Sequence, residues 1–68
     1  MTRQKFGYVI EEYRQWKFYD NQVYYCTGFD TKSDAQNALE KRKDFIIHEN
    51  DRFYRDSKIY AYEEIDCN

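Results

Sequence analysis

The spacing of the apolar residues changes at Thr31, and this change constrains the fold more than any other feature of the sequence. Residues 6–13 alternate with a period of two, which is typical of a half-buried strand. Beyond Thr31 the apolar residues recur at helical spacing instead. Strand-like segments that give way to a helix predict an α+β domain. The helical stripe consists of Ala35, Ala38, Leu39, Arg42 and Ile46.

The start of this helix is well defined by its local sequence. Segment 31–34, Thr-Lys-Ser-Asp, fits a capping box, in which the threonine hydroxyl and the carboxylate three residues later satisfy free backbone N–H groups. The end is less sharply defined. Asn50-Asp51 favours a stop near Asn50, whereas Phe53 continues the helical spacing and would extend the helix to Tyr54. We expect the stop near Asn50.

Three short strands are expected before the helix and one after it. The first three form a meander with a tight turn at Asp20-Asn21, and a turn at Arg55-Asp56-Ser57 precedes the last strand. The predicted fold is an antiparallel sheet of three to four strands with one helix packed on one face, in a single compact domain over residues 1–68. In the order β-β-β-α-β, the strands are Phe6–Tyr13, Trp16–Tyr19, Gln22–Thr27 and Lys58–Ile65.

Aromatic residues make up 21% of the chain, which is more than a core of this size needs, and eight of them are tyrosine. Such a surplus favours a recognition surface. In the last strand Ile59, Ala61 and Ile65 are expected to face the helix, so that the intervening tyrosines face away from it. Nearby carboxylates either imitate a row of phosphates or serve only as solubilising charge. The predicted partner-binding residues are Tyr60, Tyr62, Glu63, Glu64, Glu11 and Glu12.

Charge and hydropathy argue against several classes of partner. The net charge is −2 with both signs interspersed, so direct nucleic-acid binding is expected to be less favoured than binding to a protein. Around the basic run Lys41-Arg42-Lys43, acidic neighbours cancel most of the local charge. No segment has the apolar length of a membrane span or of a signal peptide, so we expect no membrane partner and a cytoplasmic protein, either monomer or homodimer.

The residues that usually carry chemistry are few. Cys26, Cys67 and His48 do not have the spacing of a zinc site, so we expect no metal, no cofactor and free thiols. Cys26 and His48 could in principle form a nucleophile and base pair, but no third, orienting group is evident. The sequence therefore predicts a protein that is not an enzyme.

The segment Gly28-Phe29-Asp30-Thr31-Lys32-Ser33-Asp34-Ala35, with three short strands before it, resembles the arm-type DNA-binding domains of phage tyrosine integrases. In that family a glycine, an aromatic residue and a capping threonine join the third strand to the helix. The resemblance covers about residues 6–48. It implies a DNA-binding sheet face whose candidate contacts are Arg14, Trp16, Lys17 and Tyr24.

As a whole, this small, acidic, aromatic-rich and glycine-poor chain also resembles the anti-CRISPR inhibitors of phages and mobile elements. That resemblance implies stoichiometric binding to a host nucleic-acid-handling defence complex of the CRISPR type, which blocks nucleic-acid binding, in some cases by acting as a DNA mimic. Our leading hypothesis is such an inhibitor. The alternatives are a DNA-binding module like the integrase arm domain and an oligomerising structural protein that packs its tyrosine face against itself.

Overall fold

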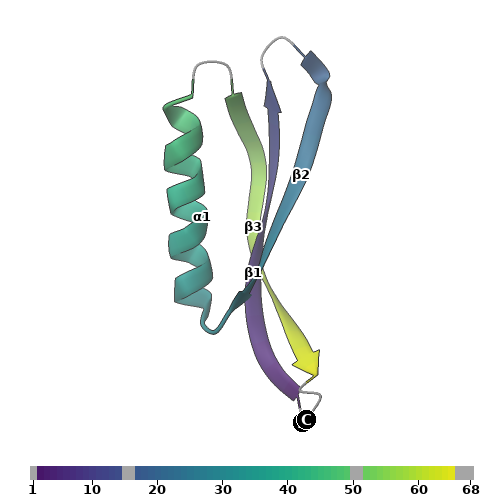
Figure 1. Cartoon of the computed structure of the whole chain (residues 1–68), viewed down its shortest axis with the longest axis vertical. Helices are drawn as coiled ribbons and strands as arrows, with labels where there is room; N and C mark the ends of the chain where they lie inside the picture. Colours follow the sequence, from purple (N-terminus) through teal and green to yellow (C-terminus); the bar gives the residue numbers. More distant parts are fainter. Residues whose placement is uncertain (1, 15–16, 50–51, 66–68) are drawn as a thin grey trace.

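The computed structural model describes residues 2–14, 17–49 and 52–65, with residues 17–21 described by their backbone alone. The elements are β1 (Thr2–Arg14), β2 (Lys17–Phe29), α1 (Lys32–Ile47) and β3 (Arg52–Ile65). The strands form one open antiparallel sheet in the order β2-β1-β3, and α1 lies against one face of it (Figure 1). The predicted α+β class, with one helix packed on one face of the sheet, is confirmed.

The predicted division into four strands is wrong, because Asp20-Asn21 lies inside β2 and the order is β-β-α-β. β1 and β2 already pair at Arg14 and Lys17, and they pair again from Glu12 and Gln22 to Phe6 and Phe29, with register shifts between Glu12 and Arg14 and between Phe6 and Tyr8. Asp and Asn favour turns through local hydrogen bonds. Asp20-Asn21 falls within the register shift next to Arg14, so its turn-like composition marks an irregularity inside β2.

The turn expected at Arg55-Asp56-Ser57 is also wrong, because these residues form an irregularity within β3. Ile10 pairs with Ser57 and the next β1 residue, Glu11, pairs with Arg55, so Asp56 is the extra residue of a β-bulge. Asp56 has a φ of 47°, in the left-handed region that aspartate tolerates better than most residues. The turn-like composition therefore marked a bulge. Its extra residue shifts the alternation of β3, so that Arg55 before it and Lys58 after it are on the same face of the sheet.

The predicted helix start is confirmed, because the Oγ1 atom of Thr31 accepts a hydrogen bond from the backbone N–H of Asp34 at 3.0 Å. The helix ends at Ile47 with His48 as its C-cap, so the expected stop near Asn50 was too late. The backbone N–H groups of His48 and Glu49 donate to carbonyls three residues earlier, which tightens the last turn and ends the helix.

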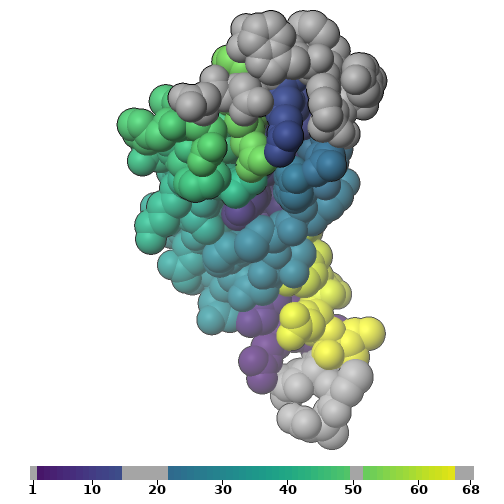
Figure 2. All heavy atoms as spheres, turned by 45° about the horizontal axis from the view of Figure 1, so that its top comes forward, coloured from purple at the N-terminus to yellow at the C-terminus, as the bar shows by residue number. Residues whose placement is uncertain are grey.

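The core lies between β1 and α1, where Ile10, Leu39 and Ile46 are almost fully buried. The helix is shorter than the strands, so the ends of β1 and β3 project beyond it as a two-stranded ribbon (Figures 1 and 2). Ala61 and Ile65 are in this ribbon and are exposed, which corrects the expectation that both pack against the helix. The molecule is accordingly elongated, with extents of 47 × 22 × 17 Å. Tyr8, Tyr54 and Ile59 pack around the core.

Candidate functional site

The sheet has a second face, which no other described element covers (Figure 1). Because Tyr8, Ile10 and Ile59 point toward the helix, the residues that alternate with them point away from it. We call this second surface the open face. It comprises Lys5, Gly7, Val9, Glu11 and Tyr13 of β1, Val23 and Tyr25 of β2, and Phe53, Arg55, Lys58, Tyr60 and Tyr62 of β3.

The two tyrosines predicted to face away from the helix do so, and close contacts fix both. Tyr60 lies over Gly7, where a Cβ atom would be 2.7 Å from the Tyr60 ring and 2.8 Å from the carbonyl oxygen of Cys26. Loss of solvent raises the pKa of the Tyr60 phenol. The Tyr62 hydroxyl accepts a hydrogen bond of 2.8 Å from the backbone N–H of Gly28, so its side chain reaches across β1 to β2. Rings held in this way lose little entropy when a partner binds.

The rest of the open face combines exposed apolar groups with a few charges. Val23 is 52% exposed and Tyr25 is 68% exposed. Toward the other end the rings of Tyr13 and Phe53 stack at 5.6 Å, and the Arg55 guanidinium lies 4.8 Å from the centre of the Tyr13 ring. Arg55 also forms an ion pair of 3.3 Å with Glu11. A shallow depression of about 380 Å³ lies among Val9, Glu11, Val23, Asp56, Ser57 and Lys58.

The four predicted partner-binding carboxylates are not brought together. Glu63 and Glu64 pair with Gln4 and Arg3 in the ribbon, and as strand neighbours they point to opposite sides of it. Glu11 is seven residues further along β1 than Gln4, which corresponds to about 23 Å at the usual rise of a strand. Of the six predicted residues, Tyr60, Tyr62 and Glu11 share the open face, and Glu64 points to the same side further along the ribbon.

Glu12, the sixth predicted residue, is on the helix side of β1 and is only 3% exposed. The Nε and Nη2 atoms of Arg42 each donate a hydrogen bond of 2.7 Å to its carboxylate, and this contact raises the pKa of the Arg42 guanidinium. Arg52 Nη1 is 3.9 Å from the same carboxylate. Glu12 therefore joins α1 to β1 through a buried charge pair and is not available to a partner.

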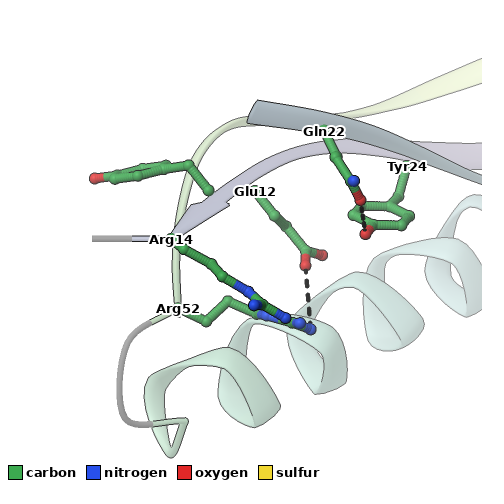
Figure 3. A pocket seen from close by; sticks show the side chains of 6 residues that line it. Glu12, Arg14, Gln22, Tyr24 and Arg52 are labelled. Atoms are coloured by element: carbon green, nitrogen blue, oxygen red, sulfur yellow. Dashed lines mark hydrogen bonds and ion pairs between the residues drawn. The ribbon is translucent and has the colours of Figure 1, made fainter. Parts of the chain in front are cut away.

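A hollow of about 90 Å³ lies beside this pair, near the end of the sheet where β1 and β2 are connected (Figure 3). Arg14 and Arg52 are directly opposite each other on β1 and β3, and both line the hollow. The Tyr24 hydroxyl donates a hydrogen bond to Gln22 on its wall. We call this feature the arginine hollow. It is lined by Glu12, Tyr13, Arg14, Gln22, Tyr24 and Arg52.

Three of the four residues predicted as DNA contacts lie at this end of the molecule. Arg14 and Tyr24 both line the arginine hollow, and the backbone of Lys17 pairs with that of Arg14. Trp16 lies outside the described residues. Sequence reasoning missed Arg42 and Arg52 as members of this cluster. A signal for Arg42 was present, because a charged residue within the apolar stripe of a helix needs a buried partner.

The residues considered for catalysis have separate neighbours. Cys26, on β2, is a free cysteine next to the Tyr8 phenol, while His48 is 3.7 Å from Asp44 on its own helix. Among the described residues, no three His, Cys, Asp or Glu side chains are placed to hold a metal ion. The described part of the chain also contains no helix with the length and apolar character needed to cross a membrane.

Comparison with known proteins identified no relatives. No protein-family model matches the chain, and no curated protein or solved structure matches it either.

Proposed function

We propose that this chain is a non-enzymatic binding protein that docks another protein on its open face. The observation that carries the proposal is the exposure of Val23 and Tyr25 beside two tyrosines that are already fixed in position. Aromatic side chains with restricted rotamers are the residues that dominate protein interfaces. An apolar surface of this kind, on a chain with so few core residues, is costly to leave in water.

The size and charge of the open face favour a protein as the partner. The three-stranded part of the sheet extends from Phe6 to Arg14 of β1, about 30 Å, and three strands are roughly 14 Å wide, which gives an area on the order of 400 Å². Protein interfaces of the smaller, transient class bury less than about 600 Å² per partner, and this area falls in that class. The charges on this face are Lys5, Glu11, Arg55 and Lys58. Glu11 forms an ion pair with Arg55, and Lys5 forms one with Asp30, so two of the three cations are neutralised. This arrangement lacks the row of cations that tracks a phosphate backbone.

The resemblance to anti-CRISPR inhibitors suggests what this partner is. We propose a protein subunit of a nucleic-acid-handling complex of the CRISPR type, which the chain would inhibit by covering a functional surface. The mode of inhibition proposed here differs from DNA mimicry, because the carboxylates are divided between the ribbon and the other end of the sheet. The proposed location is the cytoplasm, where the free thiol of Cys26 would stay reduced.

The proposal can be tested by affinity capture with variants matched in charge. Tyr25→Asp places a carboxylate on the open face, whereas Asn37→Asp places one on an exposed position of α1. Lysates from bacteria with and without CRISPR systems are treated with nuclease before capture, and the bound proteins are identified by mass spectrometry. We expect a stoichiometric partner, found only with CRISPR systems, that wild type and Asn37→Asp retain and Tyr25→Asp loses.

Three outcomes would contradict the proposal. Loss of all bound material on nuclease treatment would favour direct binding to nucleic acid, as in the integrase arm domains. A wild-type dimer in sedimentation experiments that Tyr25→Asp converts to monomer would assign the open face to a second copy of the chain. Capture that is equally strong with both variants would exclude the open face as the docking surface.

A further inference from the structure

We propose that the arginine hollow binds a single phosphate group, either as inorganic phosphate or as the phosphomonoester of a small molecule. The groups that would hold the phosphate are distinct from the open face, because Glu12 and Arg52 are on the helix side of the sheet and, among the described residues, the two surfaces share Tyr13 alone. The inference therefore does not depend on the proposed protein partner.

The first argument is an unfavourable pairing within the sheet. Arg14 and Arg52 are Cα partners on neighbouring strands, and like charges that face each other directly across a sheet are destabilising. The β2 partner of Arg14 is Lys17, so three basic residues occupy one row across the three strands. An anion bound at this row would relieve the repulsion between the two guanidinium groups.

Second, donors outnumber acceptors around the hollow. Arg14 and Arg52 line it together with one carboxylate, Glu12, and Arg42 already occupies both oxygens of that carboxylate. Arg52 is 3.9 Å from that carboxylate, which is beyond hydrogen-bond distance. Arg14 has no hydrogen bond or ion pair with any other described residue. Two guanidinium groups therefore keep N–H donors that Glu12 does not use.

The third argument is geometric. Figure 3 shows the side chains of Arg14 and Arg52 running in the same direction, toward α1, so their donor groups gather on one wall of the hollow. The planar guanidinium fork matches the oxygen atoms of a phosphate group. A volume of about 90 Å³ accommodates a group of that size, but not a nucleoside with its base and sugar.

The surroundings favour one phosphate group over a polyanion. Beyond Arg52 the surface continues past Glu49, whose carboxylate would repel a second phosphate. The net charge of the whole chain is −2, which also disfavours a long polyanion. A nucleic-acid strand is therefore a worse match for the hollow than a compact phosphate.

The test is a titration of the full chain with inorganic phosphate at low ionic strength, followed by the ¹H–¹⁵N signals of the arginine side chains. We expect saturable binding in the millimolar range, with the largest shifts at Arg14 and Arg52. Arg14→Gln should weaken it about tenfold or more, since it removes charge-assisted hydrogen bonds. Arg55→Gln, the same change on the open face, should alter the affinity less than about twofold.

Arg14 is exposed, so Arg14→Gln is expected to fold, and its backbone spectrum verifies this. Parallel titrations with glycerol phosphate and with a 5′-mononucleotide show whether the ligand is inorganic phosphate or a phosphomonoester. Affinities equal to that for inorganic phosphate support inorganic phosphate, and tighter binding of either ester supports a phosphomonoester. The proposal is overturned if sodium chloride at matched ionic strength gives the same shifts, or if Arg55→Gln and Arg14→Gln weaken phosphate binding equally. It is also overturned if a DNA oligonucleotide binds far more tightly than every small phosphate.

Discussion

Replacing Glu12 with Gln tests the buried charge pair that joins the helix to the sheet. The amide has nearly the same shape as the carboxylate, but it has no charge and one of its two acceptor atoms becomes an NH₂ donor. Arg42 would keep one of its two hydrogen bonds of 2.7 Å and would lose the other. Its guanidinium would then remain beside Arg52 without a compensating anion.

The expected loss follows from these contacts. A hydrogen bond to a charged group contributes about 1.5–3 kcal/mol, and orphaning one member of a fully buried ion pair costs about 3–5 kcal/mol. The Arg42 side chain is 28% exposed, so water recovers part of this cost. We expect Glu12→Gln to lose about 2–4 kcal/mol of the roughly 3–10 kcal/mol available to a domain of this length. The melting temperature should fall by roughly 10 °C or more.

The assay is urea unfolding followed by far-UV circular dichroism, with Glu11→Gln as the matched control. Glu11 is adjacent to Glu12 on β1 and forms an ion pair with Arg55, whose side chain is half exposed. Glu11→Gln should therefore lower the free energy of unfolding by at most about 1 kcal/mol. Adding Arg42→Met to Glu12→Gln removes the orphaned charge and should recover part of the lost stability. The coupling free energy between the two substitutions should be at least about 1 kcal/mol. A loss from Glu12→Gln no larger than that from Glu11→Gln would refute this account of the pair.

Three further predictions concern local contacts. Gly7→Ala places a Cβ atom against the Tyr60 ring and the backbone of β2, so it should lower the free energy of unfolding by about 1–3 kcal/mol in urea titrations. Thr31→Ala removes the acceptor at the helix N-cap and should cost about 1 kcal/mol by the same measurement. The ammonium group of Lys5 lowers the pKa of Asp30 through a hydrogen bond. This contact therefore stabilises the fold at pH values above the ordinary pKa of aspartate, and the stabilisation is lost as the pH falls through the lowered pKa of Asp30. The titration midpoint of Asp30, measured by carboxyl ¹³C NMR, should accordingly rise in Lys5→Gln.

Local signals predicted the elements whose determinants are also local. The helix start depends on one side chain and the backbone three residues away, and it was located correctly. Turn signals were less reliable, because Asp20-Asn21 and Asp56 both lie in strands whose course is set by pairing along the whole of β1. Composition alone does not distinguish a turn from a bulge, since both use residues that tolerate unusual backbone angles. The difference is decided by partners that are distant in sequence.

The arginine hollow was missed for a related reason, although both residues of the ion pair beside it stood out in the sequence. Glu12 has the same strand phase as Tyr8 and Ile10, and Arg42 falls in the apolar stripe of the helix. A charged side chain at a position that the pattern predicts to be buried is stable only beside a buried counter-charge. Glu12 and Arg42 are two such residues, and they have opposite signs. Pairing them would have removed Glu12 from the predicted acidic surface, and the pairing of β3 with β1 then brings Arg52 opposite Arg14. The order of the strands, which periodicity does not encode, was the missing information.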